Sequence, residues 1–326
     1  MSEKDTVTKE YMQDNVVFAD AFNYFLYDGE QIINHEQLKP LDTTAIALPY
    51  GEDNDTVPVQ KYRDILKMVT AKEDDKAAYL LLGIENQSDI HYAMPVRNML
   101  YDALQYASQV NSAGKSHRKG NNKPESSAEY LSGFYKSDRI LPVITLTMYF
   151  GADEWTAPRN LYQMLDADER ILKYINNYSI FLIEPKAIPD ENFFKFKSEL
   201  GQVLKYVKYS KDKHKLIGVV EEDETYRHIS RRTANMINVV TGSQLKLQSG
   251  KESIDMCEAI ENLRNDAIAE GERRGLIEGK IKGAKEEAVN IANRLIEHGS
   301  MTLEEISLMT GLSFDEVRSL ADNKSI

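Results

Sequence analysis

The segment Tyr79-Leu80-Leu81-Leu82-Gly83-Ile84-Glu85-Asn86-Gln87 decides the fold, because an almost uninterrupted apolar run leads directly into polar residues. Such a run is typical of a strand that is buried on both faces of a sheet. The segment Tyr62-Arg63-Asp64-Ile65-Leu66 comes before it, and a charged loop from Thr70 to Lys76 separates the two. We therefore predict two adjacent strands joined by a hairpin-like turn, each carrying one acid.

Two acids and a glutamine mark the candidate site. Side chains two residues apart on a strand point to the same side, so Glu85 and Gln87 are expected to share a face. A neighbouring strand can place Asp64 beside Glu85, and the backbone carbonyl of Asn86 would be a natural third ligand. Converging carboxylates suit Mg²⁺, which can activate water against a phosphodiester. The alternative is that both acids are ordinary surface or strand-edge residues.

The remaining pattern predicts a mixed α/β core. A helix over residues 14–30 ends at Asp28-Gly29, where a turn signal follows the last apolar residue. Further strands are predicted over Arg139–Tyr149 and Tyr178–Ile183, and further helices over residues 192–209 and 222–240.

The segment from Met94 to Val110 is predicted to be a helix, with Pro95 in its first turn. Its predicted apolar face consists of Val96, Leu100, Ala103, Leu104 and Ala107. A second stripe carries Arg97, Tyr101 and Gln105 at spacings of four, which places them on one side of the helix.

An ordered set of segments resembles the PD-(D/E)XK nuclease core, and more specifically the Rpn family of recombination-promoting nucleases and transposases. The matching segments are Phe18-Ala-Asp-Ala-Phe-Asn23, Arg63-Asp-Ile65, Ile84-Glu-Asn-Gln87, Met94-Pro-Val-Arg-Asn-Met-Leu-Tyr-Asp102, Pro142-Val-Ile-Thr-Leu-Thr-Met-Tyr-Phe-Gly151 and the tail from Glu270 to Ser313. The resemblance implies a mixed central sheet flanked by helices, followed by a long helix and a small helical unit. It also implies a Mg²⁺-dependent DNA endonuclease, with Mn²⁺ as a possible substitute.

The resemblance also assigns roles to individual residues. Gln87 stands where related nucleases carry a lysine, and a glutamine can orient water but brings no charge. Arg97 is the expected substitute for that charge, unless it forms an ordinary ion pair. Asp20 matches an acid on the family's first helix; it either binds the metal through water or is a structural cap or a surface acid. Tyr101 and Gln105 either position a phosphate or the Gln87 side chain, or they are packing residues.

Composition and charge restrict the partners. The net charge of −12 disfavours broad affinity for nucleic acid, so a nuclease of this composition must concentrate its cations locally. The segment Asn111–Ser127 contains Lys115, Arg118, Lys119 and Lys123 and is predicted to be a mobile loop that either grips DNA or is merely solvated. No apolar run is long enough to cross a membrane, and a single cysteine favours the cytoplasm.

The tail differs from the rest of the chain. Residues 254–298 show one long charged helical pattern in which Gly271, Gly275, Gly279 and Gly283 recur every four residues. Each interior glycine costs about 0.8–1 kcal/mol relative to alanine, so the stripe favours either close self-association or a flexible linker. After it, Thr302-x-x-Glu305 and Ser313-x-x-Glu316 predict two capped helices.

Three regions are therefore expected: a nuclease-like domain over residues 1–250, a charged helix over 251–300 and a helix-turn-helix-like unit over 301–326. The leading interpretation is a cytoplasmic DNA endonuclease that forms a homo-oligomer through its tail. The alternatives are a catalytically inactive relative that binds DNA or protein, and a nuclease effector in toxin or phage defence.

Overall fold

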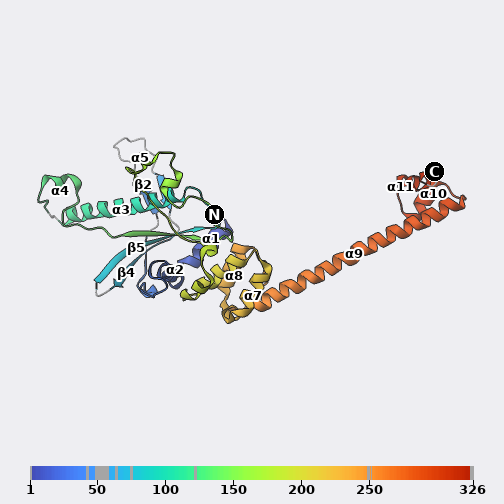
Figure 1. Ribbon diagram of the computed structural model, residues 1–326, viewed down its shortest axis with the longest axis horizontal. Helices are drawn as coiled ribbons and strands as arrows, with labels where there is room; N and C mark the ends of the chain where they lie inside the picture. Colours follow the sequence, from blue (N-terminus) through green and yellow to red (C-terminus); the bar gives the residue numbers. More distant parts are fainter. Residues whose placement is uncertain are drawn as a thin grey trace. The chain divides into compact units, whose positions relative to one another are not determined.

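A five-stranded mixed sheet in the order β1-β4-β5-β6-β7 lies at the centre of the first part of the chain (Figure 1). The computed structural model describes residues 2–41, 44–47, 59–62, 65–73, 76–120, 123–247, 250 and 252–323. The strands of the sheet are β1 (Lys39–Pro40), β4 (Ile65–Glu73), β5 (Lys76–Gln87), β6 (Val143–Tyr149) and β7 (Phe181–Ile183).

The predicted hairpin is present and longer than expected. β4 and β5 pair antiparallel, with Ile65 opposite Ile84 at one end and Glu73 opposite Lys76 at the other. Thr70 to Glu73 therefore continue the strand instead of forming a loop. On its other edge β5 pairs in parallel with β6, and β6 in parallel with β7.

Helices cover both faces of this sheet. The crossover from β5 to β6 contains α3 (Met94–Lys119) and α4 (Ser127–Ser132), as a parallel connection requires. α3 lies over one face, and α1 (Glu3–Gln13) and α2 (Asn15–Tyr27) lie over the other (Figure 1). Asp28 in the left-handed region and Gly29 end α2, as the sequence predicts.

Further short elements complete the first part of the chain. The helices are α5 (Glu169–Leu172), α6 (Leu200–Tyr209), α7 (Lys213–Glu222) and α8 (Arg231–Thr241). The 3-10 turns are η1 (His35–Gln37), η2 (Leu161–Met164), η3 (Pro185–Ala187), η4 (Asp190–Lys195) and η5 (Glu224–His228). Two small antiparallel ladders pair β2 (Thr44–Ala47) with β3 (Val59–Tyr62) and β8 (Ile229–Ser230) with β9 (Ser253–Ile254).

The chain divides into two compact units, Met1–Ile260 and Glu261–Ile326. The first unit extends past residue 250, because Ile254, Met256 and Ala259 are buried and β9 pairs with β8. The second unit contains most of α9 (Met256–His298) together with α10 (Leu303–Thr310) and α11 (Phe314–Asp322). In the part of the chain that the structure describes, no helix combines the length and apolarity needed to cross a membrane.

The small helices at the end of the chain pack on the last turns of α9. Ala292, Ile306, Leu312 and Val317 form one buried cluster, and Lys285 on α9 pairs with Glu316 on α11 at 2.7 Å. Both predicted capping boxes are present, at Thr302 and Ser313. The two helices and the end of α9 therefore share one core.

The predicted apolar face of α3 is wrong. Val96 and Leu100 are 40% and 36% exposed, and Ala103 and Ala107 are also exposed. The buried residues of α3 are instead Met94, Pro95, Asn98, Tyr101, Asp102 and Gly114. Polar side chains face the sheet because β6 offers them hydrogen-bonding partners, so hydrophobic periodicity identified the wrong side.

Candidate active site

Glu85 lies in the middle of the sheet and is completely buried. It follows Ile84 on β5, the strand that pairs with the hairpin on one side and with the parallel strand β6 on the other. Glu85 is paired with Thr147, and Gln87 with Tyr149, so the two side chains share the face that α3 covers. Glu85 and Gln87 therefore point to the same face of the sheet, as the sequence predicts.

Arg97 supplies the opposite charge. It lies in the first turn of α3, and its Nη2 is 3.0 Å from Glu85 Oε2. The Arg97 side chain is 33% exposed, so the guanidinium lies between the buried carboxylate and solvent. Its Cζ is 5.7 Å from the centre of the Tyr101 ring, which is one turn further along α3. The structure thus brings Glu85, Arg97 and Tyr101 together.

The other predicted site residues are near Glu85 or Tyr101 in the sequence. Gln87 is almost buried, and its backbone carbonyl accepts a hydrogen bond from the Phe150 amide at 2.9 Å. Asn86 is half-buried, and Gln105 is half-buried one turn beyond Tyr101 on α3. Asp64 lies outside the described residues; it directly precedes Ile65, the strand partner of Ile84.

Asp20 occupies a different environment on α2. Its Oδ1 accepts a hydrogen bond from the Lys197 amide at 2.8 Å, and its Oδ2 accepts from the Ser198 amide at 2.8 Å and hydroxyl at 2.6 Å. Burial raises the pKa of Asp20, and the hydrogen bonds from Ser198 and Lys197 oppose that rise. These contacts fix the segment that leads into α6, which is the structural role that the sequence left open.

Replacing Asp20 with alanine is expected to lower the free energy of unfolding by about 1–3 kcal/mol, because the donors of Lys197 and Ser198 lose their acceptor. Urea denaturation measures the change. Asp153→Ala is the control, since Asp153 is exposed and pairs with Lys211 at the surface. Equal, small losses in the two variants would show that the Asp20 contacts do not stabilise the fold.

A polar layer between α3 and β6 was missed by the sequence analysis. Asn98 Nδ2 donates to Thr147 Oγ1 at 2.9 Å, and Asp102 accepts from Thr145 at 2.5 Å and from the Tyr178 hydroxyl at 2.6 Å. Asn98 and Asp102 are four residues apart on α3, and the threonines alternate on β6. Polar residues one turn apart on the helix and two apart on the strand were the only sign in the sequence that these two faces meet. The layer fixes α3, and with it Arg97, against the sheet.

His91 is a second residue that was missed. It lies between β5 and α3, and its Nδ1 accepts a hydrogen bond from the Ala93 amide at 3.2 Å. Burial lowers the pKa of His91, and the nearby charge of Arg97 lowers it further. A neutral imidazole beside this edge of the sheet can accept a proton or a hydrogen bond.

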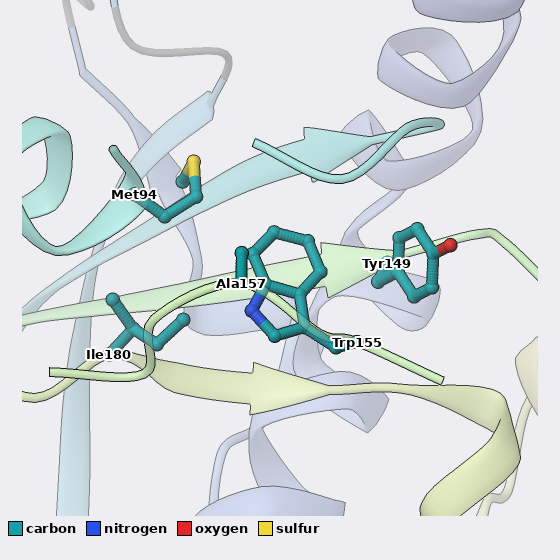
Figure 2. Packing of buried hydrophobic residues seen from close by; sticks show 5 residues of the cluster. All are labelled: Met94, Tyr149, Trp155, Ala157 and Ile180. Carbon is teal, nitrogen blue, oxygen red and sulfur yellow. The ribbon is translucent and has the colours of Figure 1, made fainter. Parts of the chain in front are cut away.

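An apolar cluster closes the same end of the sheet (Figure 2). It consists of Met94, Tyr149, Trp155, Ala157 and Ile180. The Tyr149 ring meets the edge of Trp155 with their centres 5.3 Å apart. A Cβ on Gly151 would lie 2.1 Å from the Tyr149 ring, so the chain needs a glycine where it turns back over that ring. The cluster gives Gln87, which pairs with Tyr149, a rigid support.

The described residues provide only part of a metal site. Glu85 offers hard carboxylate oxygens of the kind that Mg²⁺ prefers, and at present they face Arg97. Within the described ranges, no group of three His, Cys, Asp or Glu residues could hold a metal ion. A complete site at Glu85 would therefore need Asp64 or backbone oxygen atoms.

Comparison with known families finds a match for most of the first unit. A family model described as "Putative transposase, YhgA-like" matches residues 5–226, which covers the sheet, α3 and most of the helices of the first unit. Comparison with curated proteins and with solved structures gives no match.

Proposed function

The chain belongs to this YhgA-like transposase family, and we propose that it is a metal-dependent DNA endonuclease whose active site is centred on Glu85. The observation that carries the proposal is a completely buried carboxylate in the central strand, facing an arginine from the first turn of the next helix. The fold would then be a PD-(D/E)XK-like core, and the protein would act in the cytoplasm.

Stability alone gives no reason for Glu85. Taking the Glu85 carboxylate out of water costs several kcal/mol, and a well-packed apolar residue in the place of a buried charge is often as stable or more so. Its partner on the same face, Thr147, is completely buried and is already hydrogen-bonded to Asn98, so the packing there requires no charge at position 85. A buried charge retained in such a setting, at the edge where the parallel strands end, supports a chemical role.

In the proposed site Asp64 and Glu85 hold Mg²⁺ or Mn²⁺, and the backbone carbonyl of Asn86 is the third protein ligand. When bound, the ion would supply an activated water molecule and stabilise negative charge on the phosphate. Arg97 supplies the fixed positive charge that Gln87 lacks, and it reaches solvent where a phosphate would enter. Gln87 and Tyr101 orient the water and the phosphate by hydrogen bonding.

A plasmid-nicking assay tests this function. The full chain is expected to convert supercoiled plasmid to nicked or linear DNA with Mg²⁺ or Mn²⁺ and to leave it intact in EDTA. Plasmid that stays supercoiled with every divalent ion, at protein concentrations that bind it, would instead favour the inactive relative. A nuclease effector of toxin or phage defence would cut in this assay too and would differ in harming the cell that expresses it.

The tail is proposed to join copies of the chain. From Arg264 to Glu287 every residue of α9 is exposed except the half-exposed Glu270, and Ile268, Leu276, Ile277 and Ile281 are 47–65% exposed. A single helix in water gains little from propensity, and packing normally supplies its stability. A Cβ at any of the four stripe glycines would meet nothing within 4 Å in one chain. A second copy could therefore approach that stripe closely.

A further inference from the structure

The far end of α3 and the segment after it form a small projecting element, which we call the α3–α4 tip. It comprises residues 111–120 and 123–140, and it lies at the end of α3 where α4 is attached (Figure 1). The sequence predicted a mobile loop over Asn111–Ser127, and this is wrong for Asn111–Lys119, which continues α3. α4 begins at Ser127, directly after its capping residue Ser126.

Specific contacts hold the tip in shape. A Cβ on Gly114 would lie 3.1 Å from the Gly133 carbonyl, so the two segments meet backbone to backbone. His117 Nε2 is 2.9 Å from Asp138 Oδ2, and its ring stacks on Tyr135 with centres 3.7 Å apart. The tip is therefore an ordered element with its own polar and aromatic contacts.

The tip reverses the charge of the chain. Residues 111–140 contain six Lys and Arg against three Asp and Glu, whereas the whole chain carries −12. Two of the acids face inward: Glu129 accepts hydrogen bonds from the Glu125 and Lys136 amides, and Asp138 is paired with His117. The six cations are all exposed; they are Lys115, Arg118, Lys119, Lys123, Lys136 and Arg139. The outer surface is thus strongly basic.

Two apolar side chains project from the same element. Tyr130 and Leu131 on α4 are 75% and 83% exposed. Cationic residues belong to the same element: Arg118 Nη1 would lie 4.0 Å from a Cβ on Gly133, which follows α4, and the Lys136 backbone amide donates to the Glu129 carboxylate of α4. An exposed aromatic ring on an element with a surplus of exposed cations is the combination with which proteins hold a single strand, by stacking bases and neutralising phosphates.

We propose that the α3–α4 tip binds DNA, with its cations on the phosphates and Tyr130 stacked on an unpaired base. This binding is separate from cleavage and requires no metal. It would give an acidic chain a local basic surface through which to hold its substrate.

Fluorescence anisotropy of the full chain in EDTA tests the proposal with a labelled single strand and a matched duplex over a range of salt. The triple variant Lys115→Gln/Lys119→Gln/Lys123→Gln is expected to weaken binding. On the single strand, the slope of log K against log salt should become less steep by about 2, since each lost phosphate contact reduces that slope by roughly 0.7. The control Lys186→Gln/Lys213→Gln/Lys215→Gln makes the same charge change at exposed sites elsewhere. Equal slopes in the two variants would overturn the proposal.

Tyr130→Ala is expected to weaken single-strand binding by roughly fivefold to a hundredfold and to leave duplex binding unchanged. Tyr174→Ala is the matched control, because Tyr174 is 81% exposed and also lies beside a lysine, Lys173. Unchanged single-strand affinity in Tyr130→Ala, or an equal loss on duplex, would overturn the stacking role. No cutting occurs in EDTA, so an inactive enzyme would not alter either result.

Discussion

Glu85→Gln is expected to abolish metal-dependent cleavage while leaving the protein folded. Glutamine keeps the shape of the side chain and removes the anionic oxygen that a hard divalent ion requires. The loss should be on the order of a hundredfold or more in cleavage rate, since stabilisation by the metal is worth several kcal/mol and each 1.36 kcal/mol is tenfold. Nicking rates at saturating Mg²⁺ and Mn²⁺ measure it.

The free energy of unfolding should change little in the same variant. Neutralising Glu85 removes the cost of burying its charge, and Arg97, which is 33% exposed, can still reach water. Urea denaturation is expected to give a value within about 1 kcal/mol of the wild type. A strongly destabilised Glu85→Gln protein that still cuts would identify Glu85 as a structural ion-pair residue.

The chain offers a matched control for this variant. Glu184 is also a buried glutamate that pairs with an arginine, since its Oε2 is 2.5 Å from Arg159 Nη2 and its Oε1 accepts from the Trp155 amide. Glu184→Gln makes the same chemical change at the end of β7 and should retain cleavage. Glu85→Gln protein that nicks plasmid at the wild-type rate, with contaminating nuclease excluded, would contradict the proposed mechanism.

Removing residues 265–326 is expected to reduce the oligomer to a monomer and to leave the first unit folded. The cut follows the end of the first unit at Ile260 and keeps the buried residues Ile254, Met256 and Ala259. A cut at 254 would remove those core residues and confuse assembly with unfolding. Sedimentation gives the mass, and an unchanged ratio of that mass to the monomer mass would exclude the tail as the site of assembly.

Replacing the four stripe glycines with alanine separates close packing from a flexible linker. In an exposed, unpartnered helix the four changes would add roughly 3–4 kcal/mol of helix stability. If a second backbone approaches the stripe, the methyl groups prevent it and the oligomer dissociates. We expect dissociation, because each added Cβ meets nothing within 4 Å in the single chain and can only clash with another copy.

The control for the glycine variant is Glu278→Ala/Lys280→Ala. Both residues are exposed and adjoin Gly279, and each therefore lies about 100° round the helix from that glycine. This variant keeps the net charge and should leave the mass unchanged. An intact oligomer in the glycine variant, with raised helix content by circular dichroism, would show that the stripe acts as a linker.

The sequence predicted the hairpin and the position of Glu85 because strand signals are local. The apolar run identifies a strand, and the alternation of side chains along a strand determines which side each residue faces; the pairing of β5 with β6 agrees with it. The long helix and both capping boxes were predictable for the same reason. Asp64 stays a prediction, since it lies outside the described residues.

The sequence did not predict the contacts between segments that are distant in the chain. Hydrophobic periodicity pointed to Val96 and Leu100, whereas α3 packs through Asn98 and Asp102, which bind partners about 45 residues away on β6. The α3–α4 tip has loop-like composition, yet Gly114 and Gly133 allow a close backbone contact that orders it. Such pairs have no signal in either segment alone.

The single tryptophan of the chain makes the two units optically distinguishable. Trp155 is buried in the apolar cluster of the first unit, and residues 261–326 contain neither tryptophan nor tyrosine. Its emission therefore follows the packing beside β6 alone, whereas circular dichroism also records the helices of the second unit. If the units unfold independently, the two signals will give different denaturation midpoints, and a single unfolding free energy will not describe the chain.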